Sequence, residues 1–179
     1  MTPVAGGDTA RCGVIEDGAN RYFVKQHRHN LLLEAEARGL EALSPSLRVP
    51  RVVHCFGSSE GGVLILEYLP IAPLETNRDW MAAGAALARL HRAEAPDRYG
   101  NHPDNFIGAT PQSNTSHADW IAFFANERLK PQLQRARQRG LSTLAAERTA
   151  QVIEQLDRWL PSRPPCAQLH GDLWQGTLG

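Results

Sequence analysis

The chain has 179 residues, 42% of them hydrophobic, which suffices for one globular domain or two small lobes. Lys and Arg together number 19, as do Asp and Glu, so the formal net charge is zero and argues against nucleic acid or an anionic membrane as a partner. The longest apolar run, residues 63–66, is too short to cross a bilayer, and no signal peptide is visible. Three cysteines without metal-ligand spacing predict a reduced, cytoplasmic setting.

The first seventy residues predict a small antiparallel sheet with one helix. Residues 11–16 and 21–25 are typical strands around a hairpin turn at 17–20. Residues 31–43 predict an amphipathic helix, because apolar residues recur there at steps of three and four. Residues 49–53 and 63–68 return to extended chain.

The rest of the chain predicts mainly helices. A helix from Asp79, its expected cap, to about Arg92 precedes an irregular loop over residues 96–116. Two more helices are expected over 119–139, with a break or new start at Pro131, and over 142–160. A short strand is expected at 167–169. We therefore predict a bilobal α+β fold, with an N-lobe over residues 1–69 and a helical C-lobe over 70–179.

Two helical surfaces have a composition of their own. The basic run from Arg128 to Arg139 contains no acid, and a solvated helix face is the favoured interpretation over a binding patch. The last helix carries the apolar residues Leu144, Val152, Leu156 and Trp159. If this stripe is exposed, the chain is expected to be marginally stable or to self-associate.

Lys25 ends a predicted strand downstream of a glycine-rich turn. Kinase-like folds use an ammonium in this position to reach nucleotide phosphates, and a carboxylate on the next helix to hold it. Glu36 is the favoured partner because it shares a face with the apolar residues, and Glu34 is the competitor. Gly6 and Gly7 would form the turn that covers the phosphates, although these glycines taken alone favour a plain hairpin turn.

Two further segments fit the same chemistry. Glu67, Tyr68 and Leu69 follow a buried strand, where kinase-like folds hold adenine through backbone groups. The string His170-Gly171-Asp172-Leu173 is typical of a catalytic loop. Asp172 would accept the proton of the hydroxyl to be phosphorylated, and His170 would organise the loop.

Together these motifs resemble the fructosamine kinase / ketosamine-3-kinase family. The catalytic loop matches through Trp174 and Gly176. A second block that is peculiar to the family consists of Tyr99-Gly100, Asp104-Asn105-Phe106-Ile107-Gly108, Pro111-Gln112, Asn114, Trp120 and Phe123-Phe124. The resemblance covers nearly the whole chain.

The resemblance implies a protein-kinase-like fold that uses ATP and Mg²⁺ to phosphorylate the 3-hydroxyl of a ketosamine sugar or a glycated protein, a deglycation repair. It implies that Asp104, Asn105, Gln112, Asn114 and Trp174 lie near the sugar. Some family members carry an oxidisable cysteine in the phosphate turn. Cys12 lies within or beside that turn, and an inert thiol is the favoured interpretation.

The sequence departs from the family pattern near its end. Thr177 stands where the family has an Asn ligand of Mg²⁺, and it would be a weaker ligand. Family members continue past the catalytic loop to an Asp-Pro motif that binds Mg²⁺, so a truncated chain with little or no kinase activity is expected. A non-catalytic remnant and an aminoglycoside- or choline-type phosphotransferase are the alternatives.

Overall fold

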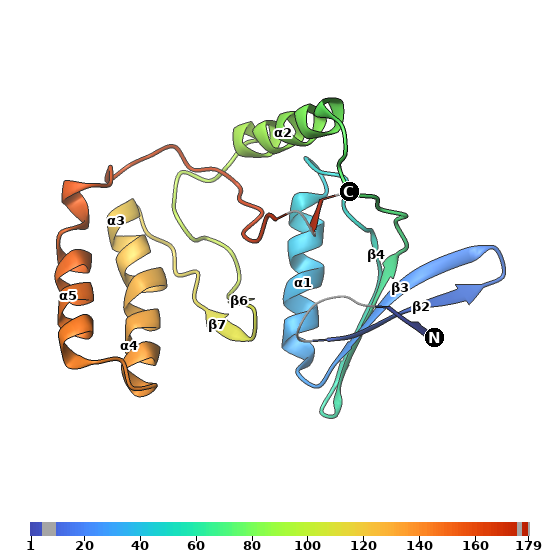
Figure 1. Cartoon of the computed structure of the whole chain (residues 1–179), viewed down its shortest axis with the longest axis horizontal. Coiled ribbons are helices and arrows are strands. Elements are labelled where there is room, and N and C mark those ends of the chain that lie inside the picture. The colour runs from blue at the N-terminus through green and yellow to red at the C-terminus, as the bar shows by residue number, and fades with distance from the viewer. Residues whose placement is uncertain (5–9, 175–176, 179) are drawn as a thin grey trace. The chain divides into compact units, whose positions relative to one another are not determined.

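A computed structural model of the chain describes residues 1–4, 10–174 and 177–178, which form two compact units. The first unit combines residues 1–94 with 167–179, and the second comprises residues 95–166. Each unit is coloured by residue number in Figure 1. An antiparallel sheet in one unit and helices in both confirm the predicted α+β class.

The first unit is built on a five-stranded sheet with the order β1-β2-β3-β5-β4, in which every described neighbouring pair is antiparallel. The strands are β1 (Thr2–Pro3), β2 (Arg11–Asp17), β3 (Asn20–His27), β4 (Val52–Ser58) and β5 (Gly61–Glu67). The predicted hairpin joins β2 to β3, and its turn uses Gly18 at a φ of 59°, which favours glycine.

Helix α1 (Asn30–Leu43) covers one face of this sheet (Figure 1). Leu33 and Ala37 of the helix pack against Leu64 and Leu66 of β5, and all four are buried. Burial alternates along β5 because successive side chains of a strand point to opposite faces. The face that carries Leu64 and Leu66 is therefore the face beneath α1.

Helix α2 (Asn77–Arg92) also belongs to the first unit. The prediction that Asp79 is its cap is wrong by three positions, because Thr76 occupies the cap and Asp79 closes a reciprocal capping box with it. The Thr76 hydroxyl accepts from the Asp79 amide at 3.2 Å, and the Asp79 carboxylate accepts from the Thr76 amide at 2.9 Å. The Thr76 amide and hydroxyl both donate to the Asp79 carboxylate, and these two bonds hold the pKa of Asp79 below its ordinary value.

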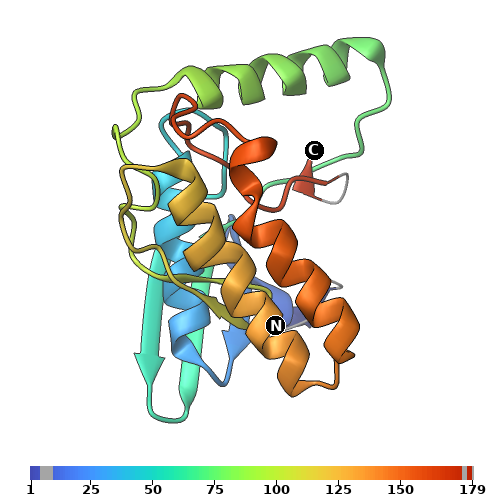
Figure 2. The same ribbon diagram turned by 90° about the vertical axis from the view of Figure 1, so that its left-hand side faces the viewer.

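The second unit is mainly helical. One continuous helix is divided into α3 (Trp120–Phe123), a π-helical turn η1 (Phe124–Leu129) and α4 (Lys130–Gln138). Pro131 lies in the first turn of α4 and has no amide proton to donate to the preceding turn. The backbone hydrogen bonds just before it therefore follow the wider π-helical pattern of η1. Helix α5 (Thr143–Glu154), followed by the 3₁₀ turn η2 (Leu156–Arg158), returns alongside α4 (Figure 2).

The apolar stripe of the last helix, a candidate for an exposed face, is mostly exposed. Leu144, Val152 and Trp159 are exposed as expected, whereas Leu156 is buried. The buried face is instead formed by Ala146, Ile153 and Leu156, which pack with Leu133 of α4. The small Ala146 lets two helices approach closely, whereas the predicted stripe considered only large side chains.

Two other expectations need correction. The loop over residues 96–116 contains a short hairpin of β6 (Asn105–Ile107) and β7 (Thr110–Gln112), with Gly108 at a φ of 57° in its turn. Residues 167–169 form no strand, because they pair with no strand among the described residues. None of the described helices is long and apolar enough to cross a membrane.

Candidate active site

The sheet register determines where Lys25 emerges. Lys25 pairs with Leu64 of β5 in an antiparallel register, and directly paired residues share a face. Leu64 faces α1, so the Lys25 side chain leaves the sheet on the helix side. The same register places Cys12 of β2 opposite Lys25.

Glu36 meets this lysine from α1. Lys25 Nζ lies 2.6 Å from Glu36 Oε1, and both side chains are partly buried. Glu34, the alternative partner, hydrogen-bonds to Asn30 at 3.2 Å and lies 4.0 Å from Arg38. The structure thus brings Lys25 together with Glu36, three residues after the buried Leu33 on the same helical face.

Cys12 lies inside the sheet rather than at a surface turn. Its side chain is buried, and this burial raises the pKa of the thiol, although the nearby Lys25 opposes the shift. A raised pKa leaves little of the reactive thiolate at neutral pH. The prediction that this thiol is inert has that physical basis.

The segment expected to hold adenine has its side chains engaged in local contacts. The Arg48 guanidinium donates two hydrogen bonds of 2.6 and 3.0 Å to the Glu67 carboxylate, and the Arg51 amide donates a third at 3.2 Å. The Arg21 guanidinium lies 4.0 Å from the centre of the Tyr68 ring, and the Leu69 carbonyl accepts from the Ile71 amide. Contact of this segment with adenine remains a prediction for its backbone.

These bonds make the contribution of Glu67 to stability dependent on pH. Hydrogen bonds from the Arg48 guanidinium and the Arg51 amide lower the pKa of Glu67 from 4.5 to about 2. A depressed folded-state pKa stabilises the native chain above the unfolded pKa, and this gain disappears as the pH falls through the folded value. We expect Glu67→Gln to lower the melting temperature at pH 7, with a difference that narrows from pH 4.5 downward. An equal difference at pH 7 and pH 3 in thermal melts would contradict this linkage.

The segment with the proposed catalytic residues belongs to the same compact unit as Lys25. Asp172 and Trp174 are exposed, and Gly171 turns the chain at a φ of 89°. His170 is half-buried, and its Nδ1 is buried without a hydrogen-bond partner among the described residues. The tip of this loop therefore presents its carboxylate outward while the imidazole is turned inward.

Thr177 closes this segment onto itself. Its hydroxyl donates to the Trp174 carbonyl at 2.9 Å and also lies 3.3 Å from the Asp172 carbonyl. The hydroxyl oxygen accepts a hydrogen bond from the Trp174 amide at 3.2 Å. The described residues contain no group of three or more His, Cys, Asp or Glu that could hold a metal. The predicted phosphate turn at Gly6 and Gly7 lies outside the described residues.

The predicted substrate residues of the second unit form one hydrogen-bonded loop. The Asp104 carboxylate accepts from the Asn114 amide at 2.8 Å. Asn105 Oδ1 accepts from Gln112 Nε2 at 3.0 Å and from Asn114 Nδ2 at 3.2 Å. Asn114 is buried, whereas Asp104 and Asn105 are exposed. Asn114 thus serves the interior of the loop and its neighbours form the surface.

Two arginines of the basic run anchor this loop, contrary to the prediction that the whole run is solvated. Arg128 Nη1 donates to the Ser113 carbonyl and Nη2 to Asn114 Oδ1, both at 2.6 Å. Arg135 Nη2 donates to the Pro111 carbonyl at 3.0 Å. The seven-residue spacing that puts both on one helix face was the available sequence signal.

A clasp between His117 and Glu127 holds the other side of the loop. His117 Nε2 lies 2.9 Å from Glu127 Oε1 with both side chains largely buried, and this bond lowers the pKa of Glu127. The backbones of His117 and Tyr99 exchange two hydrogen bonds of 2.9 Å. Glu127 also joins Asp104, Gln112 and Arg135 in lining a hollow of about 200 Å³.

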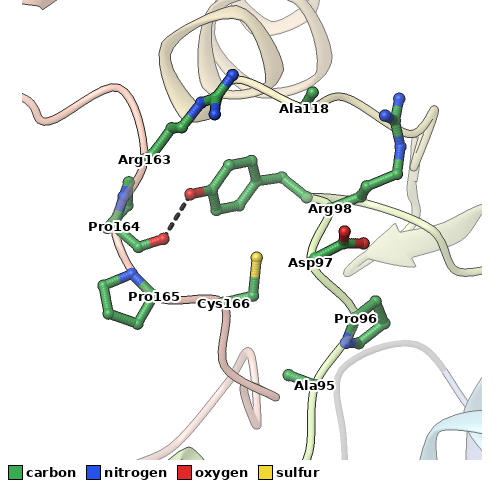
Figure 3. A pocket seen from close by; sticks show the side chains of 10 residues that line it. Ala95, Pro96, Asp97, Arg98, Ala118, Arg163, Pro164, Pro165 and Cys166 are labelled. Atoms are coloured by element: carbon green, nitrogen blue, oxygen red, sulfur yellow. Dashed lines mark hydrogen bonds between the residues drawn. The ribbon is translucent and has the colours of Figure 1, made fainter.

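A larger hollow of about 470 Å³ lies elsewhere in the second unit, beside Tyr99. The Tyr99 hydroxyl donates a hydrogen bond to the Pro164 carbonyl, and Figure 3 draws Pro164 with the neighbouring Pro165 and Cys166 among the residues that line this hollow. Burial raises the pKa of the Tyr99 hydroxyl. Three proline rings line the space, and none of the predicted site residues does.

The chain is similar in sequence to several ketoamine kinases and similar in structure to solved kinases. A ketoamine kinase of Synechocystis sp., named as probable, is 40% identical over 181 residues, which cover 97% of this chain and 59% of the relative. A probable ketoamine kinase of Vibrio parahaemolyticus is 34% identical, over 98% of this chain and 62% of its own length. The chain therefore spans about three fifths of the length of these relatives.

Solved structures that resemble this chain also include a kinase of this kind. A "putative fructosamine-3-kinase" of Thermobifida fusca superposes with a TM-score of 0.81 at 30% identity, over 98% of this chain and 62% of the other. An aminoglycoside phosphotransferase, at 14% identity and a TM-score of 0.54, over 90% of this chain and 56% of the other, shares the fold alone. The sequence model of the fructosamine kinase family matches residues 1–179. This chain belongs to the fructosamine kinase family.

Proposed function

We propose that the chain carries the nucleotide-binding and catalytic-loop parts of an ATP-dependent kinase that phosphorylates the 3-hydroxyl of a ketosamine. The observation that supports this most directly is the 2.6 Å contact between Lys25 and Glu36. A lysine held by a carboxylate of the next helix is the pair that kinase-like folds use to bind ATP phosphates. The names of the relatives support a ketoamine as the substrate.

The residues fit ATP through the chemistry of this pair. An ammonium group has three donors, and Glu36 accepts one of them, so two remain for phosphate oxygens. Glu36 also fixes the direction of a flexible side chain, which lowers the entropy lost on binding. We assign the adenine to the backbone of residues 67–69 and the phosphates to Gly6 and Gly7.

Asp172 is proposed to accept the proton of the sugar hydroxyl as its oxygen attacks the γ-phosphoryl group. Its exposed side chain is accessible to a substrate, and the Thr177 hydroxyl lies against its carbonyl. The bound metal would neutralise charge on the phosphates. The exposed Trp174 offers an indole face to the apolar side of a sugar ring. We place this reaction in the cytoplasm, where it would serve the repair of glycated amines.

We further propose that Thr177 makes the metal site weak. Its single hydroxyl oxygen already takes part in three contacts within the loop, so metal binding would compete with the bonds that close the segment. An Asn side chain has both a carbonyl oxygen and an amide donor. It could therefore bind the metal and still close the loop.

The purified chain, incubated with ATP, Mg²⁺ and a fructosyl-amine, is expected to form a sugar 3-phosphate only slowly because its metal site is weak, and ³¹P NMR after a long incubation measures this product. Thr177→Asn is expected to lower the Mg²⁺ concentration for half-maximal rate by about tenfold, in line with typical effects of metal-site ligands. Thr143→Asn, at an exposed threonine at the start of α5, is the matched control. Failure of both the wild-type chain and the Thr177→Asn variant to phosphorylate any ketosamine would reject the proposed function.

A non-catalytic nucleotide-binding remnant is the second candidate, and the commitment of Thr177 to local bonds favours it. This candidate predicts weak ATP binding with the same affinity in EDTA and in Mg²⁺. The kinase proposal predicts tighter binding in Mg²⁺, because the metal bridges phosphate oxygens. Calorimetric titrations under the two conditions distinguish the candidates.

A further inference from the structure

The loop over residues 103–115 contains side-chain amides whose orientation is set by a neighbouring arginine. Arg128 projects from the π-helical turn η1, and its guanidinium lies 4.5 Å from the centre of the Phe123 ring. Burial lowers the pKa of Arg128, yet the group keeps its proton, because the ordinary value is far above neutrality. The loop is therefore bound by a half-buried cation on its inner side.

An arginine can only donate hydrogen bonds, and this fixes Asn114. The atom that faces Arg128 Nη2 at 2.6 Å has to be the carbonyl oxygen of the Asn114 side chain. Its amide nitrogen then points the other way and donates to the Pro103 carbonyl at 2.9 Å and to Asn105 Oδ1 at 3.2 Å. Asn114, which is buried, has no alternative orientation that satisfies these partners.

The orientation of the Asn114 amide in turn fixes the orientation of the Asn105 and Gln112 amides, to which it is linked by hydrogen bonds. Asn105 presents its oxygen inward to Asn114, and Gln112 donates its nitrogen to the same oxygen at 3.0 Å. Asn105 therefore turns its NH₂ group outward, and Gln112 keeps its carbonyl oxygen for an acceptor role. Beside them, Asp104 uses one carboxylate oxygen for the Asn114 amide and keeps the second.

We propose that Arg128 is a positioning residue, which acts through Asn114 to give the loop a fixed pattern of one donor and two acceptors for the hydroxyls of the sugar. This inference rests on the proposed function and on the expectation from the family resemblance that Asp104, Asn105 and Gln112 lie near the sugar. A polyol is recognised by such a set of alternating donors and acceptors, because each hydroxyl both donates and accepts. Arg128 itself does not touch the sugar.

Arg128→Met keeps the apolar stem over Phe123 and removes every donor. We expect the KM for the ketosamine to rise by about tenfold or more, as for the loss of a charge-assisted hydrogen bond, and the KM for ATP to stay within about twofold. Arg128→Lys restores one donor and should recover part of the affinity. Arg137→Met on α4 is the control, since its side chain is exposed and makes no hydrogen bond with the described residues.

A merely structural role would not change substrate selectivity. We therefore compare kcat/KM for a ketosamine with that for the analogue lacking one ring hydroxyl, and we expect Arg128→Met to reduce the wild-type preference by about tenfold. Hydrogen–deuterium exchange over residues 103–115 reports the loop independently of activity, and it should become faster. If Arg128→Met fails to fold, the KM and selectivity of Arg128→Lys decide.

Several outcomes overturn the inference. Faster exchange in the loop with an unchanged ketosamine KM would show that the loop is held by Arg128 but does not contact the sugar. An equal rise in the KM values for ATP and ketosamine, or unchanged selectivity, would reduce Arg128 to a structural role. Absence of ketosamine phosphorylation by both the wild-type chain and the Thr177→Asn variant would reject the proposed function, and the inference with it.

Discussion

Replacing Asp172 by Asn is expected to lower the rate of phosphoryl transfer by about 10²–10⁴-fold, because the amide cannot accept the proton of the attacking hydroxyl. The change is nearly isosteric and lies at an exposed position, so the free energy of unfolding should stay almost the same. The dissociation constant for ATP, measured by calorimetry, should change by less than about twofold, because only an interaction of the reacting hydroxyl is lost.

The control for this change is Asp157→Asn, at an exposed carboxylate of η2. It should leave both rate and ATP affinity unaltered. Asp172→Glu should retain part of the rate, since a carboxylate remains but is displaced by one methylene. An Asp172→Asn protein with more than about a tenth of the wild-type rate would remove the general base from the proposed mechanism.

The part of the site that follows from local spacing could be predicted from the sequence. Lys25, two residues before the end of β3, and Glu36 on the apolar face of the next helix lie close because strand and helix periodicity point both toward the same layer. The hairpin around Gly18 was predictable for the same reason, since turn chemistry is local.

Contacts between distant segments could not be predicted in this way. The grip of Arg48 on Glu67 joins residues nineteen positions apart, and no periodic pattern connects them. Arg128 was placed with the solvated charges, although it anchors Ser113 and Asn114 across a loop. The exposure of Leu144, with Ala146 buried instead, depends on how closely α4 and α5 pack. Tertiary geometry decides each of these features.

The pair at Lys25 allows a test that separates its two members. Lys25→Met should weaken ATP binding by about 100-fold, because charge-assisted bonds to the phosphates are lost. Glu36→Gln should weaken binding less, since the ammonium remains but is no longer held in direction. If Glu36 acts only through Lys25, the double variant should bind ATP as the Lys25→Met protein does.

Glu34→Gln is the matched control on the same helix. Glu34 contacts Asn30 and Arg38 rather than Lys25, so its neutralisation should leave ATP affinity within about twofold of the wild type. Fluorescence titration with an ATP analogue measures all four variants against the wild-type chain. Additive losses in the double variant would show that Glu36 acts independently of Lys25, and equal effects of Glu34 and Glu36 would attribute both to general charge. In either case the 2.6 Å contact would be a structural ion pair, and the nucleotide site would have to be sought elsewhere.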